Sequence, residues 1–390
     1  MPSRRRVLAA SGAIGACALA GCLGSRDVDP DLSGNWLQVG YDASNANFSP
    51  EQVLPNGLTE AWRERIGLAE QFIPIVVDGT VFAGGDDGLF AFDAADGTHR
   101  WDRDLEGLVT NGAAVDGETL LVTEYRDDNP SRVRGFDLDD GDEQWSLTID
   151  SRPFAPTVVD GRAYLQLDSG CLAVSGGEID WHVEWEPIAY PEYNVRRLGT
   201  VASTIAPAAT RDRVVVVDQD AIVALDPADG TEQWRRALHG ANASPIVLDD
   251  TVLGLGLDDV VALDPDGEER WRMAAGRWGT IAAADGEIYV LGAGELTALD
   301  IENGEESWTG HVSGDVVRTQ PTGVGNAVVA TTSRGYVFQR GDPGFFGDRE
   351  LFEFDGKFGT EFWSSATAGA GRVFACDRNH GDLVAFEPES

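Results

Sequence analysis

Short apolar runs alternate with polar turns along most of this chain. From residue 73 to residue 101 the runs IPIVVD, TVFAGG, LFAFD and THRW are separated by Asp78-Gly79, Asp87-Gly88 and Asp96-Gly97. Asp-Gly pairs suit hairpin turns with positive φ, and apolar runs between such turns suit β-strands. The pattern predicts antiparallel units of four short strands, with no helical segment beyond the N-terminus.

The same unit recurs, and each copy ends on a tryptophan. AFDAADGTHRW ends at Trp101, ALDPADGTEQW at Trp234 and ALDIENGEESW at Trp308. A recurrence at roughly 36 to 55 residues is typical of four-stranded propeller blades. We interpret the tryptophans as structural residues that pack between neighbouring sheets, and the glycine four positions earlier as a turn residue. The predicted blade tryptophans are Trp62, Trp101, Trp145, Trp181, Trp234, Trp271, Trp308 and Trp363.

The two ends of the repeat region complement each other. Residues 368–390 contain three strands of a unit, whereas Leu58–Trp62 carries the tryptophan with no strands before it. Joining them completes one blade, closes the ring and removes exposed sheet edges. We therefore predict an all-β, eight-bladed β-propeller of four-stranded antiparallel blades, as one domain over residues 35–390. Seven blades is the alternative, because the third and seventh units are irregular.

The N-terminus is predicted to be an export signal. Three arginines precede a short apolar stretch, which is too short to span a bilayer. Arg4 and Arg5 with the following Val-Leu resemble a twin-arginine signal, and Leu-Ala-Gly-Cys ending at Cys22 resembles a lipobox. This resemblance implies removal of residues 1–21, lipid modification of Cys22, and anchoring to the outer face of the cytoplasmic membrane. Residues 22–34 then form a polar, flexible tether.

Charge and cysteine content narrow the class of protein. The net charge is −37, and Lys357 is the single lysine. This composition resembles exported proteins of salt-loving archaea, because molar salt screens such self-repulsion. It excludes nucleic acid as a partner. Cys171 and Cys376 fall in the third and eighth units, too far apart around the ring for a disulfide, so we expect buried thiols. Asn47 and Asn242 begin glycosylation sequons whose use stays open.

No catalytic or metal-binding constellation is evident. The histidines lack metal-ligand spacing, no Cys-x-x-Cys pair occurs, and neither a nucleophile elbow nor a P-loop is present. We therefore predict no catalytic residue and no metal site.

The phrase Ala-x-Asp-x-x-x-Gly-x-x-x-Trp resembles the pyrroloquinoline-quinone-type propeller repeat over nearly all of residues 32–390. One branch of that family, the quinoprotein dehydrogenases, implies a bound quinone, calcium and adjacent cysteines under the cofactor. The chain has no adjacent cysteines. The resemblance is therefore to the cofactor-free, BamB-like branch, which implies a non-enzymatic role with neither quinone nor calcium.

The remaining expectations concern binding surfaces. One insertion, residues 182–203, and another, residues 339–350, lengthen the fourth and seventh intervals, and the sequence does not decide whether they share a face. We expect a membrane-anchored platform that binds an unidentified protein partner; alternatives are a quinone-dependent oxidoreductase and a protein that binds or senses anionic small molecules. The candidate ligand or partner face, in loops between blades, comprises Arg152, Tyr190, Tyr193, Arg196, Arg197, His239, Arg277, Trp278, His311, Arg318 and Gln320.

Overall fold

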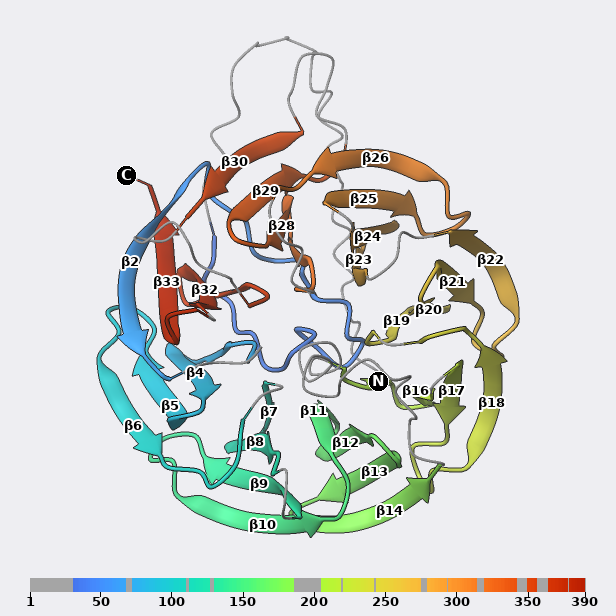
Figure 1. The fold of residues 1–390 in the computed structure, drawn as a ribbon, viewed down its shortest axis with the longest axis horizontal. Coiled ribbons are helices and arrows are strands. Elements are labelled where there is room, and N and C mark those ends of the chain that lie inside the picture. Colours follow the sequence, from blue (N-terminus) through green and yellow to red (C-terminus); the bar gives the residue numbers. More distant parts are fainter. Residues whose placement is uncertain are drawn as a thin grey trace, which may run out of the picture.

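The chain forms a closed ring of eight sheets, the blades, each of which contains four antiparallel strands (Figure 1). No helix occurs among the described residues. The fold class, the number of blades and the antiparallel pairing predicted from the repeat are confirmed. The computed structural model describes residues 31–67, 72–109, 112–126, 130–185, 205–218, 220–241, 243–274, 279–292, 294–313, 319–341, 349–355, 364–377 and 379–389.

Each blade is built from the centre outwards, and its four strands follow one another in the sequence in all but the last blade. Blade 1 comprises β3 (Ile75–Val77), β4 (Thr80–Gly85), β5 (Gly88–Asp93) and β6 (His99–Arg103), and blade 2 comprises β7 (Ala113–Asp116), β8 (Thr119–Glu124), β9 (Ser131–Asp137) and β10 (Glu143–Ile149). Blade 3 comprises β11 (Pro153–Val159), β12 (Arg162–Leu167), β13 (Gly170–Ser175) and β14 (Glu178–Glu184). Blade 4 comprises β15 (Ala208–Ala209), β16 (Val214–Asp218), β17 (Ala221–Leu225) and β18 (Glu232–Ala237). Blade 5 comprises β19 (Ile246–Leu248), β20 (Thr251–Leu255), β21 (Asp259–Leu263) and β22 (Glu269–Ala274). Blade 6 comprises β23 (Thr280–Ala284), β24 (Glu287–Gly292), β25 (Glu295–Asp300) and β26 (Glu306–His311). Blade 7 comprises β27 (Thr322–Val324), β28 (Ala327–Thr331), β29 (Gly335–Gln339) and β30 (Glu350–Phe354).

Blade 8 combines one strand from the N-terminal part of the chain with three strands from its C-terminal part. Its three inner strands are β31 (Thr367–Gly369), β32 (Arg372–Asp377) and β33 (Asp382–Pro388), and its outermost strand is β2 (Leu58–Arg65). β2 pairs antiparallel with β33, from Leu58 opposite Pro388 to Arg65 opposite Asp382. The predicted closure of the ring by an N-terminal strand is confirmed.

One of the three Asp-Gly turns in the first unit has positive φ at both residues, as predicted, whereas at Asp87-Gly88 and Asp96-Gly97 only the glycine does. Asp78 and Gly79, between β3 and β4, have φ of 47° and 77°. Two successive positive φ angles match the right-handed twist of the paired strands. The first unit thus folds as its sequence pattern predicts, strand by strand.

Alternating connections define two faces of the ring. The turns between first and second strands, and between third and fourth strands, lie on one face, which we call the plug face for the segment described below. The turns between second and third strands and the connections between blades lie on the opposite face. This follows from the antiparallel order of every blade.

The blade tryptophans lie between neighbouring sheets, as predicted. Trp234 in blade 4 covers Gly267 in the β21–β22 turn of blade 5, and its indole N–H donates to the carbonyl oxygen of Pro265 at 2.9 Å. A Cβ on Gly267 would lie 2.6 Å from the Trp234 ring. The repeat glycine therefore leaves room for the preceding blade's indole, in addition to adopting φ of 78° in its own turn. Equivalent indole bonds are made by Trp62, Trp101, Trp181 and Trp271.

Blade 7 departs from this pattern. In blade 6 the register places Ala298 opposite Trp308, and the corresponding pair in blade 7 is Val337 opposite Phe352. Phe352 packs against the hydrophobic core between blades 7 and 8. Trp363, which the sequence predicts as the tryptophan of this unit, lies outside the described residues.

Candidate functional site

A segment of the chain's own N-terminal region runs around the centre of the ring, inside the innermost strands of the blades (Figure 1). This segment, residues 31–53, which we call the plug, passes all eight blades in turn and closes on itself through the antiparallel bridge between Asp31 and Val53. It also contributes β1 (Phe48–Ser49), which pairs parallel with β27. Backbone amides of the innermost region donate to plug carbonyls: Val76 to Trp36 (2.9 Å), Val115 to Leu37 (3.0 Å), Ala209 to Ala43 (2.7 Å), Val247 to Ser44 (2.9 Å), Ala283 to Ala46 (2.9 Å), Gly323 to Asn47 (2.8 Å) and Gly371 to Leu32 (2.7 Å).

Side-chain amides complete the attachment of the plug. Asn45, which is 2% exposed, donates to the carbonyls of Ala206 and Pro245, each at 3.1 Å. The carbonyl oxygen of the Gln38 side chain accepts from the Val158 amide at 2.8 Å, which supplies the contact with blade 3. Amide side chains offer both donors and acceptors, so they satisfy backbone groups that would otherwise be buried unpaired.

An apolar contact closes the axis of the ring. Val39 is fully buried and packs with Ile73, Ala155 and Ala206, from blades 1, 3 and 4. Because these residues converge on one valine, the channel is filled at this level by the chain itself.

The plug changes the predicted boundary of the domain. Residues 31–34 were expected to belong to a flexible tether, but Leu32 is 3% exposed and a Cβ on Gly34 would lie 2.6 Å from the Gln52 side chain. Leu32 and Gly34 are packed, whereas Asp31 and Ser33 are exposed, and the Asp31–Val53 bridge holds this stretch against the plug's other end. Residues 1–30, with Arg4, Arg5, Cys22 and most of the predicted tether, lie outside the described residues.

The structure of the plug shows whether Asn47, in one of the two sequons, can carry a glycan. Asn47 is 1% exposed, and its side-chain amide donates to the carbonyl of Pro321. A glycan on this nitrogen is incompatible with the folded plug. Asn242 lies outside the described residues.

Four members of the predicted ligand face are described. Arg152, His239 and Gln320 lie in connections between blades on the face opposite the plug, and His311 is the last residue of β26, where that strand reaches the same face. Within the described part of the chain, no hydrogen bond or ion pair joins any two of them. The seven others lie outside the described residues: Tyr190, Tyr193, Arg196, Arg197, Arg277, Trp278 and Arg318.

Arg152 has an unusual environment for an arginine of this protein. Its guanidinium carbon lies 4.8 Å from the ring centre of Tyr125 and 5.7 Å from that of Phe154. Its Nε is buried without a hydrogen-bond partner among the described residues. Most other described arginines pair with carboxylates, whereas Arg152 pairs with none that the structure describes. This is the environment of a cation available to an anionic group.

His239 and Gln320 are held in different ways. The His239 Nδ1 lies 2.9 Å from a carboxyl oxygen of Asp220, whose pKa is lowered first by the Gly240 amide and then by this imidazole. Gln320 is 3% exposed, and its backbone amide donates to the Ser365 hydroxyl at 2.8 Å. His239 is thus paired at the surface, while Gln320 belongs to the interior.

The two insertions join the blades on opposite faces. The first, residues 182–203, begins within β14, the fourth strand of blade 3, whose end lies on the face opposite the plug. The second, residues 339–350, runs from the end of β29 to the start of β30, and these ends lie on the plug face. Residues 186–204 and 342–348 lie outside the described residues. The choice that the sequence left open is settled by this order of strands.

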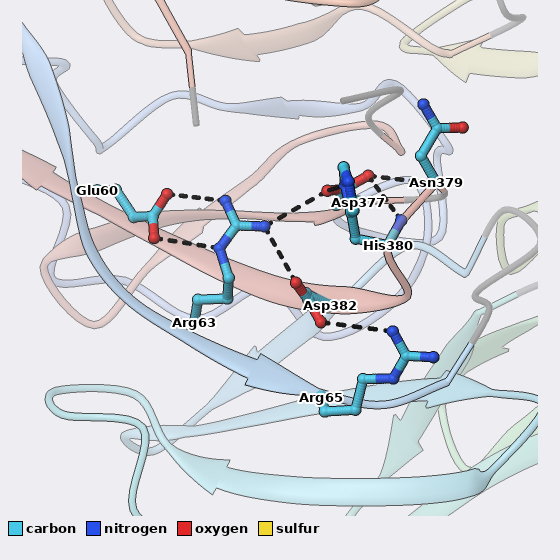
Figure 2. A network of polar contacts seen from close by, with 7 residues as sticks. All are labelled: Glu60, Arg63, Arg65, Asp377, Asn379, His380 and Asp382. Atoms are coloured by element: carbon cyan, nitrogen blue, oxygen red, sulfur yellow. Dashed lines mark hydrogen bonds and ion pairs between the residues drawn. The ribbon is translucent and has the colours of Figure 1, made fainter. Parts of the chain in front are cut away.

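A network of charged side chains joins β2 to the end of the chain in blade 8 (Figure 2). Arg63 lies 2.8 Å from Glu60, 3.1 Å from Asp382 and 3.4 Å from Asp377. Burial opposes the charge on Arg63, but the hydrogen bonds to Glu60 and Asp382 outweigh it and raise the pKa of the guanidinium. Asp377, whose side chain is fully buried, also bonds His380 Nδ1 at 2.6 Å. The network fastens the seam of the ring, and we call it the clasp.

The two described cysteines lie in different blades and do not form an adjacent pair. Cys171 in β13 and Cys376 in β32 are free and fully buried in separate blades, and burial raises the pKa of both thiols. They are inert core residues, as predicted, and cannot form the pair that the enzyme branch places under its cofactor. Among the residues that the structure describes, no group of three His, Cys, Asp or Glu side chains could hold a metal ion. In the same part of the chain, no helix has the length and apolar character needed to cross a membrane.

A comparison with known protein families matches most of the propeller region to one family. The chain matches the family described as outer membrane protein assembly factor BamB over residues 54–175, 170–259 and 256–385. The chain belongs to this family. The plug precedes the matched residues, so the match does not account for it. No curated protein matches the sequence.

Solved structures of diverse proteins share the fold. BamB from Moraxella catarrhalis is 13% identical with a TM-score of 0.66, covering 85% of this chain and 100% of its own. A quinohemoprotein alcohol dehydrogenase from Pseudomonas putida HK5 is also 13% identical, with a TM-score of 0.67 and coverage of 92% and 83%. The computationally designed Ika8 protein is 14% identical, with a TM-score of 0.64 and coverage of 83% and 99%. An assembly factor, an oxidoreductase and a design share this architecture, so the fold alone assigns no activity.

Proposed function

We propose that this protein is a non-enzymatic platform that binds a protein partner and is anchored outside the cytoplasmic membrane through Cys22. The observation that carries the proposal is the plug. The centre of a propeller is where residues from all blades converge, and here it is filled by a segment bonded to every blade. The outer surfaces then remain for recognition, and membership in a family described as an assembly factor supports a protein partner.

The plug also orients the molecule in this proposal. Asp31, the first described residue, lies at the plug face, because it pairs with Val53 beside the first-to-second-strand turns. The chain from Cys22 to Asp31 can span roughly 30 Å when fully extended. An anchor at Cys22 would therefore hold the plug face toward the bilayer and the opposite face away from it.

A second candidate function, anion binding, is favoured by Arg152 alone. Its guanidinium lies over two aromatic rings, with no carboxylate partner among the described residues. An anion would bind on the face away from the membrane. A redox enzyme is disfavoured by the separate, buried cysteines, and added quinone with calcium should produce no saturable absorbance change.

Membrane fractionation of Cys22→Ser, with Cys17→Ser as the matched control, tests the proposal. We expect the wild type and Cys17→Ser in the membrane fraction, and Cys22→Ser released in folded form. Crosslinking in intact membranes should then join the wild type to a defined partner at constant stoichiometry. Equal membrane retention of Cys22→Ser would contradict the anchor, and a wild type that crosslinks to nothing would contradict the platform.

A further inference from the structure

The outer surface of the plug is hollowed at the centre of the ring. This hollow, which we call the plug pocket, has a volume of about 310 Å³ and is lined entirely by plug residues. That volume is at the lower end of the range for small-molecule sites, roughly 300 to 1,000 Å³. It is large enough for one long side chain and too small for a large cofactor.

The plug pocket carries negative charge without a counter-charge. Asp31, Asp42 and Glu51 line it, and none of its lining residues is basic. No arginine or histidine of the described residues forms an ion pair with these three carboxylates, although most described arginines pair elsewhere. The Ser33 hydroxyl and then its amide lower the pKa of Asp31, so this carboxylate stays ionised at neutral pH.

Two further lining residues carry buried acceptors that lack a donor. Gln52 is 2% exposed, and its Nε2 is fixed by a 3.0 Å bond to the carbonyl of Ala368. Its Oε1 has no partner in the described part of the chain. The Ser49 hydroxyl, fully buried, likewise has none there. A buried acceptor without a donor is costly, so a ligand that donates several hydrogen bonds would be favoured here.

Apolar surface adjoins these polar groups. Leu37, one of the few exposed large hydrophobic residues, is 41% exposed and lines the plug pocket with Tyr41. The Tyr41 ring is fixed edge-on against the buried Trp36, with ring centres 5.0 Å apart. An alkyl chain can lie along Leu37 and Tyr41 while its charged end reaches the carboxylates, which is how lysine and arginine side chains pack.

We propose that the plug pocket receives the guanidinium or ammonium group of a basic side chain from the partner protein. The group would donate to the carboxylates and to the acceptors on Gln52 and Ser49, while its stem packs on Leu37 and Tyr41. The described carboxylates are not grouped closely enough to hold a metal ion, which favours a cation on a flexible stem. The three carboxylates are exposed, so salt weakens their attraction for the cation, whereas hydrogen bonds to the neutral, buried acceptors on Gln52 and Ser49 do not depend on this attraction. The inference rests on the proposed protein-binding role, but not on the anchor.

Binding of two pentapeptides tests this inference on the full-length protein in molar potassium chloride. The probe is acetyl-Gly-Gly-Arg-Gly-Gly-amide, and its neutral counterpart carries citrulline in place of arginine. We expect saturable binding of the arginine peptide, measured by calorimetry, and at least tenfold weaker binding of the citrulline peptide. Glu51→Gln should weaken the arginine peptide about threefold to tenfold. Glu302→Gln, an exposed acid outside the plug pocket, removes the same charge and should change nothing.

Thermal unfolding of each variant shows whether it is folded. Leu37→Arg is a second test, because it places an arginine of the protein's own chain at the plug pocket, where it would compete with the peptide. We expect Leu37→Arg to abolish peptide binding. Equal binding of both peptides, or equal loss in Glu51→Gln and Glu302→Gln, would overturn the inference. Tighter binding of free putrescine than of the arginine peptide would overturn the assignment to a partner's side chain. If the peptides do not bind but crosslinking in membranes still yields a defined partner, this inference fails while the proposed function stands.

Discussion

Five of the described blade tryptophans join their blade to the next by two contacts: Trp62, Trp101, Trp181, Trp234 and Trp271. The indole ring covers the glycine of the following third-to-fourth-strand turn, and the indole N–H donates to a carbonyl in the same turn. Trp308 differs, because blade 7 has no such turn: its Nε1 is buried without a partner among the described residues, and Arg349 lies over its ring at 4.6 Å. The two types of tryptophan can therefore be compared within one molecule.

Replacing Trp234 by phenylalanine should destabilise the protein more than the same change at Trp308. Both variants lose similar ring surface, but only Trp234→Phe loses the bond to Pro265. A buried hydrogen bond contributes about 1 kcal/mol to the free energy of unfolding, so we expect a difference of that size. Urea unfolding of both variants measures it, and equal losses would show that the indole bond does not join the blades.

Residues that recur from unit to unit could be predicted from the sequence, whereas residues that occur once could not. The described blade tryptophans and the turn glycines were predicted because a repeated unit exposes its own packing rule. The plug was missed, because its residues occur once and have no strand periodicity. One signal was present: from Asn35 to Pro50 a highly acidic chain contains one acid, Asp42, among several amides and apolar residues. Such a charge-poor stretch is typical of a buried segment.

At the scale of elements, the pairing of β2 with β33 closes the ring, and the clasp fastens that pairing. Arg63 comes from β2, whereas Asp377 and Asp382 come from the β32–β33 hairpin. Sequence predicted the pairing, since the last unit lacks a fourth strand. It did not predict the clasp, because acids are so frequent here that no pair of charges stands out.

Arg63→Leu should destabilise the protein strongly. The change leaves the buried Asp377 and the nearly buried Asp382 without their shared cation, and removing one partner of a buried ion pair costs about 3 to 5 kcal/mol. Arg211→Gln is the control, because the Arg211–Asp160 pair is exposed on both sides and should contribute nothing measurable. Denaturant unfolding compares the variants; equal stability of Arg63→Leu and the wild type would contradict the role of the clasp.

At the scale of the whole molecule, unbalanced negative charge opposes the closed ring. The chain carries 66 acidic and 29 basic residues. Surface ion pairs recover little of this repulsion, since exposed pairs are weak and are themselves screened by salt. Salt should therefore stabilise the protein on balance, because at molar concentrations the Debye length falls to about 3 Å.

The unfolding temperature should rise steadily between 0.1 M and 2 M potassium chloride. Differential scanning calorimetry measures it. A protein with the same unfolding temperature across this range would contradict both the electrostatic argument and the resemblance to proteins from salt-loving organisms.

Hydrogen exchange measured by mass spectrometry tests the central claim, that residues 31–53 are an integral plug bonded to all eight blades. The amides of Ala209, Val247 and Ala283 donate to plug carbonyls, and those of Trp36 and Asn47 belong to the plug itself. We predict that peptides covering residues 36–53 exchange as slowly as the blade strands, and that both lose protection together in denaturant. Rapid exchange of residues 36–53 while the blades stay protected would contradict the plug, and with it the account of the filled ring.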